Sequence, residues 1–180
     1  PLIIPMLHRL FLLFLVSGLA TLQADLQLAS PFGDHMVLQR DKPVPVWGWA
    51  EPGTTITVEF AGIQKSGRAR EDGRWQVWLA PLATSAESRD FTVSGDGSIT
   101  LTDVLVGEVW LCGGQSNMER QLGPRGGQKP LYNWAAEVAA ADRPLLRQLY
   151  VAQTRATEPQ ATVEATWSVC SPATAVNFTA

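Results

Sequence analysis

Cysteine, histidine and charged residues are scarce in this sequence of 180 residues, and each shortage excludes some classes of function. It contains two cysteines and two histidines, and one histidine, His8, falls in a predicted export signal. A structural zinc site with Cys and His ligands is therefore unsupported. Lys and Arg total 14, Asp and Glu total 17, the formal net charge is -3, and no basic run occurs. These counts argue against a nucleic-acid partner and indicate no metal and no other cofactor.

The first 24 residues have the pattern of a secretory signal peptide. Met6 is the expected initiator, Arg9 supplies a positive charge, and Leu10–Val16 is an unbroken apolar run. That run is too short to span a membrane, and Ala24 occupies the position before the expected cleavage site. We expect the mature chain to begin near Asp25, to be secreted or periplasmic, and to have no membrane span; a single membrane anchor is the alternative.

The two cysteines, Cys112 and Cys170, have two possible states. In an oxidising compartment they could form a disulfide, which would stabilise the fold by closing a loop. Each also lies in an apolar stretch, where a buried free thiol is equally compatible with the pattern. The sequence leaves both states open.

Residues 25–103 are expected to form a small antiparallel β-sandwich. Short segments alternate apolar and polar side chains, and Gly, Pro and Asp mark the turns between them. The apolar residues at alternate positions of these segments include Ile56, Val58, Phe60, Trp75, Val77, Leu79, Phe91 and Val93. Pro43 and Pro45 favour an edge position for Val44–Ala50, and Asp72-Gly73 indicates a hairpin turn. The many short strands without a helical period predict a sandwich.

Residues 104–180 are expected to begin an α/β domain. Val104–Cys112 is nearly continuous apolar sequence, which is typical of a strand buried on both faces of a parallel sheet. Trp134–Ala141 is Ala-rich and predicts a helix with Asn133 as N-cap, and Leu145–Val151 predicts the next strand. Trp167–Cys170 is a further short candidate. One strand–helix–strand unit cannot cover its sheet, so this domain is expected to be incomplete.

A glycine-rich segment with a serine follows the predicted strand. Gly113 and Gly114 allow a close backbone bend, and Ser116 would present its hydroxyl with its own amide free to donate to an oxyanion. Gln115 and Asn117 are expected to brace the loop as supporting site residues. The pattern differs from the G-x-S-x-G elbow, because Met118 replaces the last glycine.

The segment Leu111–Glu119 (LCGGQSNME) resembles the nucleophile block of SGNH-type esterases, in the branch of the sialate O-acetylesterases and related acetyl xylan esterases. The flanking Met36–Arg40, Val46–Ala50 and Gly107–Trp110 agree with that resemblance, which covers nearly all of residues 26–180. Gly113 is a departure, because a serine is commoner there. The implied fold is a β-sandwich followed by the start of a three-layer α/β/α, flavodoxin-like domain, as an N-terminal fragment.

The resemblance implies that Ser116 attacks an acetyl ester on a sugar hydroxyl and forms an acyl-enzyme. The activating His and its Asp are expected in a later D-x-x-H segment, outside these 180 residues, and the fragment alone is expected to be nearly inactive. Sialate O-acetyl esters are the first expected substrate, and acetylated xylan or another polysaccharide is the second. No oligomeric state is indicated.

Two other readings compete with the esterase. Trp47 and Trp49 on a sandwich could belong to a non-catalytic carbohydrate-binding module, although their alternation beside prolines fits core packing better. A structural domain with an incidental Gly-Gly-Gln-Ser turn is the third reading. Asp34-His35 cannot form a catalytic dyad on an extended chain, since neighbouring side chains point to opposite faces, so His35 is read as a turn or surface residue.

Overall fold

The computed structural model describes residues 25–179, which form ten strands and two short helices. The expected export signal lies outside these described residues. The strands are β1 (Gln27–Leu28), β2 (Val37–Gln39), β3 (Val44–Trp49), β4 (Thr55–Phe60), β5 (Ile63–Arg68), β6 (Arg74–Leu79), β7 (Ser85–Ser94), β8 (Ser98–Gly107), β9 (Arg143–Val151) and β10 (Ala165–Cys170). The helices are α1 (Trp134–Ala139) and α2 (Pro172–Ala175).

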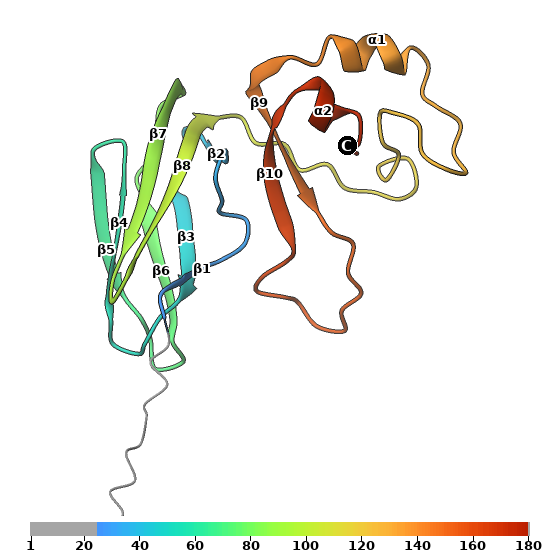
Figure 1. The fold of residues 1–180 in the computed structure, drawn as a ribbon. Coiled ribbons are helices and arrows are strands. Elements are labelled where there is room, and N and C mark those ends of the chain that lie inside the picture. Colours follow the sequence, from blue (N-terminus) through green and yellow to red (C-terminus); the bar gives the residue numbers. More distant parts are fainter. Residues whose placement is uncertain (1–24, 180) are drawn as a thin grey trace, which may run out of the picture.

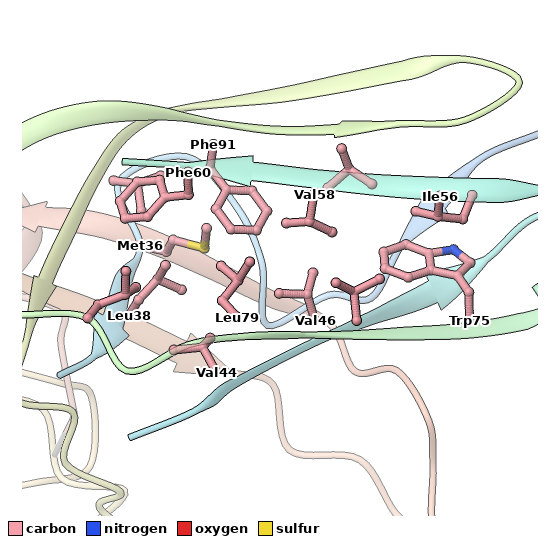
Figure 2. Close-up of a cluster of buried hydrophobic side chains, with 14 of the residues drawn as sticks. Met36, Leu38, Val44, Val46, Ile56, Val58, Phe60, Trp75, Leu79 and Phe91 are labelled. Carbon is pink, nitrogen blue, oxygen red and sulfur yellow. The ribbon is translucent and has the colours of Figure 1, made fainter. Parts of the chain in front are cut away.

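The first eight strands form two sheets that share one core (Figures 1 and 2). One sheet has the order β1-β3-β6 and the other the order β2-β8-β7-β4-β5. Pairing is antiparallel except between β2 and β8, which run parallel. This arrangement fits the expected sandwich but makes the larger sheet a mixed one.

The alternating residues of the sequence supply the core. Ile56, Val58 and Phe91 have no exposed surface, and Trp75 is 2% exposed. Each comes from an alternate position of a strand whose neighbouring side chains face solvent. Burying a large apolar side chain contributes roughly 1.5–3 kcal/mol, so this single cluster accounts for the cohesion of the sandwich.

Two local expectations in the sandwich need refinement. β3 has neighbours on both sides, β1 and β6, rather than a free edge. However, β1 pairs only with Gly48 and Trp49, so Pro45 lies on a part of β3 with a single partner strand. A Cβ on Gly48 would lie 2.0 Å from the Gln27 carbonyl oxygen, which explains the glycine between two tryptophans. The Asp72-Gly73 turn exists, but it connects β5 and β6 across the two sheets.

The expectation of a three-layer α/β/α domain is wrong for the described residues. Val104–Val106 does not begin an α/β domain but lies near the end of β8, which there pairs parallel with the short β2 of the sandwich and antiparallel with β7. It is apolar because Val104 and Val106 join the sandwich core while Leu105 is buried on the other face. β9 is a strand as predicted, yet its partner is β10, in an antiparallel two-stranded sheet. The two helices have six and four residues, too few to cover a sheet.

The C-terminal region therefore consists of a hairpin, two short helices and long loops. After β8 the chain leaves the sandwich and passes the β9–β10 hairpin on its way to α1 (Figure 1). Asn133 precedes α1 as expected, but it has a positive φ of 59° and its side chain makes no capping hydrogen bond. Within the described residues, neither helix has the length or apolar run that a bilayer span requires.

Candidate functional site

Ser116 lies in an exposed turn between the end of β8 and α1. The Met118 and Glu119 amides both donate to the Gln115 carbonyl oxygen, at 2.9 and 3.1 Å, and so close a turn around Ser116. A Cβ on Gly114 would lie 2.7 Å from Met118 Cγ, so a glycine lets the methionine fold back over the turn. The predicted site residues Gly114, Gln115, Ser116 and Asn117 thus share one compact turn.

A cavity of about 830 Å³ lies beside this turn, between the sandwich and the hairpin. Its walls are mostly apolar and come from the ends of β2 and β8, the segment after β8, β9, Trp167 and Phe178. Gly114, Gln115 and Met118 line it, whereas Ser116 and Asn117 do not. The turn therefore borders a ligand-sized hollow, with the Ser116 side chain outside its lining.

The Ser116 hydroxyl has no hydrogen-bond partner among the described residues, and its side chain is exposed. A serine hydroxyl is a weak nucleophile unless a base accepts its proton. Within residues 25–179 the single histidine is His35, and it does not line the cavity. The roles of Ser116, Gly114, Gln115 and Asn117 stay predictions at this point.

His35 belongs instead to a polar cluster that sequence reasoning missed. Its Nδ1 lies 2.7 Å from Asp103 Oδ2, and Arg147 of β9 lies 2.9 Å from the same oxygen. The Arg147 side chain is only 5% exposed. The cluster joins the sandwich to the hairpin, because Asp103 is in β8 and Arg147 is in β9.

The geometry of this cluster depends on a bulge in β8. Asp103 has a positive φ of 56°, and the core-facing positions shift from Leu101 to Val104 across it. Such an irregularity re-aims a side chain, which here brings Asp103 to Arg147. Asp34, next to His35, accepts hydrogen bonds from the Thr102 amide at 2.6 Å and its hydroxyl at 3.0 Å. No local pattern in the sequence predicts this bulge.

The Asp103 carboxyl has a perturbed pKa. Its burial raises the pKa, but hydrogen bonds from His35 and Ser88 and the charges of Arg147 and His35 lower it more. The net pKa lies below the ordinary Asp value, so the carboxylate is the favoured form in the folded chain.

The cysteines are both free thiols in the structure, which answers the alternative left open by the sequence. Cys112 is exposed, whereas Cys170 is buried and its thiol lies 3.4 Å from the Ala141 carbonyl oxygen. Burial raises the pKa of the Cys170 thiol.

Among residues 25–179, no group of three or more His, Cys, Asp or Glu side chains is placed to hold a metal ion.

The tryptophans considered as a sugar platform are partly buried. Trp47 packs edge-on against Phe32, with ring centroids 4.9 Å apart and an interplanar angle of 74°. Trp49 pairs with Gln27 of β1 and Arg74 of β6. The contacts of Trp47 correspond to the packing role that its alternation favours.

Comparisons with known proteins give a consistent result. The chain is 33% identical to the mouse and 34% identical to the human sialate O-acetylesterase, each match covering 52% of this chain. Those matches cover 19% and 20% of the two relatives, so the chain spans about a fifth of their length. No family model matches the chain.

The similarity extends to a solved structure. A carbohydrate acetylesterase from Xanthomonas citri aligns with a TM-score of 0.77 and 38% identity, over 85% of this chain and 34% of that one. The chain is thus related to carbohydrate acetylesterases by both sequence and fold. Within that class, the curated relatives that it matches are sialate O-acetylesterases.

Proposed function

We propose that this chain carries the nucleophile of a serine esterase that removes O-acetyl groups from sialic acid or related acetylated sugars. The observation that carries the proposal is the exposed Ser116 turn, which borders a cavity in a chain similar to sialate O-acetylesterases. The similarity to a carbohydrate acetylesterase from Xanthomonas citri favours a second candidate substrate, an acetylated polysaccharide such as xylan.

In the proposed reaction, Ser116 Oγ attacks the carbonyl carbon of the acetyl ester and transfers its proton to a base. The tetrahedral oxyanion collapses, the sugar hydroxyl leaves with a proton, and an acetyl-serine remains. Water then attacks the acetyl group, releases acetate and restores the serine. The Ser116 amide has no partner among the described residues and is free to donate to the oxyanion.

The base of this reaction is proposed to be a histidine outside residues 25–179, oriented by an aspartate. His35 is engaged by Asp103 through Nδ1 and does not line the cavity. We therefore propose that residues 1–180 alone hydrolyse esters very slowly. Turnover of p-nitrophenyl acetate by this chain at the rate of the full-length gene product would contradict the assignment of the base.

The test of the function is Ser116→Ala in the full-length gene product. We expect acetyl-ester hydrolysis to fall by about 10⁶-fold, the usual loss for a triad nucleophile, without a change in melting temperature. Ser168→Ala, which alters a serine of β10 away from the turn, is the matched control. Activity of Ser116→Ala within tenfold of wild type would remove Ser116 from the mechanism.

The substrate and the site of action need their own measurements. Release of acetate from O-acetylated sialic acid and from acetylated xylan, compared by kcat/KM, separates the two substrate classes.

We also propose that the protein is exported and cleaved before Asp25, giving a secreted or periplasmic enzyme. N-terminal sequencing of the cell-envelope and secreted fractions tests this, and an uncleaved N-terminus held in the membrane would favour an anchor.

A further inference from the structure

The segment between β8 and the Ser116 turn has very few contacts of its own. Trp110 and Leu111 are 83% and 98% exposed. Among the described residues, no hydrogen bond is made by the backbone between Trp110 and Gly114. The position of Ser116 therefore depends on how the two ends of this segment are held.

The far end of the segment is held by the C-terminal part of the chain. The Leu122 amide donates to the Phe178 carbonyl oxygen at 3.1 Å, and the Gly123 amide to that of Val176 at 2.8 Å. Arg125 and Glu119 form an exposed ion pair at 3.4 Å. These contacts belong to the C-terminal region of the chain, which contains few buried hydrophobic side chains.

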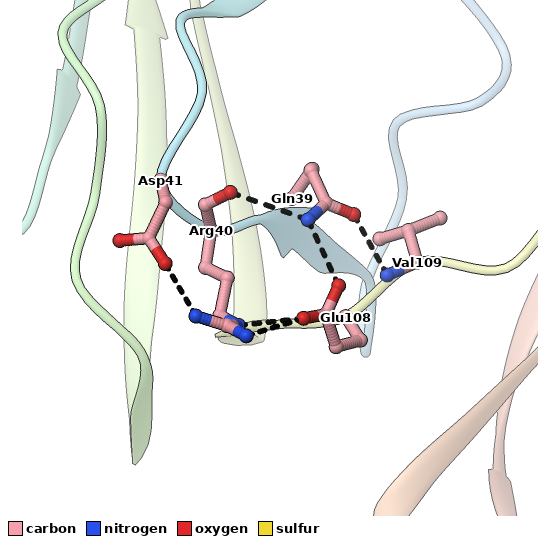
Figure 3. Close-up of polar contacts among 5 residues, drawn as sticks. All are labelled: Gln39, Arg40, Asp41, Glu108 and Val109. Atoms are coloured by element: carbon pink, nitrogen blue, oxygen red, sulfur yellow. Dashed lines mark hydrogen bonds and ion pairs between the residues drawn. The ribbon is translucent and has the colours of Figure 1, made fainter.

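The near end is held by a network from the sandwich (Figure 3). Gln39, the last residue of β2, accepts a hydrogen bond from the Val109 amide at 2.9 Å and donates to Glu108 at 3.1 Å. Arg40 reaches the other oxygen of Glu108 through Nε at 2.7 Å and Nη2 at 2.6 Å. The Arg40 amide donates to the Gly107 carbonyl oxygen at 2.9 Å, and its side chain also contacts Asp41.

This network has the geometry of a positioning device. Two contacts between a guanidinium and one carboxylate oxygen, with a side-chain amide on the other oxygen, restrict both the place and the direction of Glu108. The side chains of Arg40, Asp41 and Glu108 are 40%, 63% and 49% exposed, and exposed ion pairs contribute little to global stability. The network therefore orients a chain segment without contributing much to the melting temperature.

We propose that Gln39, Arg40 and Glu108 form a clamp by which the sandwich positions the Ser116 turn. The inference rests on the proposed function and adds to it three positioning residues, none of which touches the reacting atoms. A misplacement of about 1 Å in a reacting group can lower a rate by about 10²-fold. The sandwich then serves catalysis through the exit of β8 and not through sugar contacts.

The test compares Gln39→Met with a matched control. Methionine keeps the length of the side chain and removes all three side-chain hydrogen bonds of Gln39, to Arg40, Glu108 and Val109. Glu87→Gln removes an exposed ion pair with Arg89 elsewhere on the sandwich. In residues 1–180, hydrogen exchange of a peptide covering residues 108–118 should become faster in Gln39→Met and stay unchanged in Glu87→Gln. An unchanged exchange rate in Gln39→Met would overturn the clamp.

The kinetic arm uses the full-length gene product and p-nitrophenyl acetate. We expect Gln39→Met and Arg40→Met to lower kcat by about 10- to 100-fold, with KM within twofold and the melting temperature within about 2 °C. Arg40→Lys keeps a positive charge at position 40 to pair with Glu108, so its kcat should be higher than that of Arg40→Met. An unchanged kcat, or a kcat that falls only together with the melting temperature, would contradict a positioning role.

The two arms separate the clamp from the proposed function. A wild-type protein that is inactive and whose Ser116 resists a fluorophosphonate probe would refute the serine esterase and with it the catalytic role of the clamp. Exchange in residues 1–180 would still decide whether the clamp holds the segment. An active wild type with unaffected variants would refute the clamp alone.

Discussion

The sandwich and the C-terminal region of this chain differ in how they use apolar side chains. The sandwich buries seventeen hydrophobic residues in one cluster, whereas the C-terminal region buries three, Ala141, Cys170 and Ala175. Of eleven exposed large hydrophobic side chains, ten follow residue 108 and one, Trp78, belongs to the sandwich. Ten large apolar side chains after β8 are thus left exposed among the described residues.

This difference places the Ser116 turn on the less cohesive region. Local stability follows buried apolar contact, and segments with little of it open most readily. A turn at the end of such a segment needs anchors on a more rigid body, and the contacts of Gln39 and Asp103 provide them. The comparison explains how a packed sandwich can position the Ser116 turn of the proposed esterase without touching its substrate.

The largest expected effect would break the sandwich itself. Phe91→Ala should lower the free energy of unfolding by roughly 3–5 kcal/mol, because the side chain is fully buried and its removal leaves a cavity. Tyr132→Ala is the matched control in the C-terminal region, where the ring is 99% exposed, and should change stability by less than about 0.5 kcal/mol. Denaturant unfolding measures both, and similar losses would contradict the comparison.

An intermediate effect is expected at the junction between the regions. Asp103→Asn leaves the buried Arg147 guanidinium without its carboxylate, which should cost roughly 1–3 kcal/mol, since Asp103 itself is partly exposed. The hairpin should open while the sandwich stays folded, so proteolysis of the loop at residues 152–164 should become faster. The control is Asp72→Asn, which removes an exposed pair with Arg74.

The contribution of Asp103 to the stability of this junction depends on pH. The folded pKa of Asp103 lies below its unfolded value, so its contribution is present above the unfolded pKa of about 3.9 and is lost as the pH falls through the folded pKa. The difference in cleavage rate between wild type and Asp103→Asn should be greatest near neutral pH, begin to shrink as the pH falls below about 3.9, and disappear below the folded pKa. A difference that persists at lower pH would exclude the carboxylate as the source.

The smallest expected effect concerns the two thiols. Cys112→Ser should change the free energy of unfolding by less than about 0.5 kcal/mol, because its side chain is exposed. Cys170→Ser should cost more, since a hydroxyl replaces a buried thiol with a single weak contact. Under native conditions a thiol reagent should modify Cys112 at once and Cys170 only after unfolding. Equal rates would contradict the burial difference between the regions.

The local sequence was sufficient to predict most strands and the turn that contains Ser116. Period-two alternation marks the buried faces of β4, β6 and β7, since side chains on a strand point alternately to either face. Glycines and the serine likewise predict a close turn at Ser116, although the strand before it ends at Gly107 and not at the predicted Cys112. These features depend on neighbours within a few residues, which the sequence contains directly.

Tertiary structure alone decided which strands pair and which polar groups meet. The sequence of β9 is compatible with a parallel or an antiparallel partner, and its partner is the antiparallel β10. Val104–Val106 is buried on both faces, but the burial does not tell that it pairs parallel with β2 and antiparallel with β7 inside the sandwich. The contact of His35 with Asp103, 68 residues apart, requires positive φ angles at both residues and the approach of Arg147 from β9. Pairing and bulges are set by contacts between distant segments, whose free energies no local pattern records.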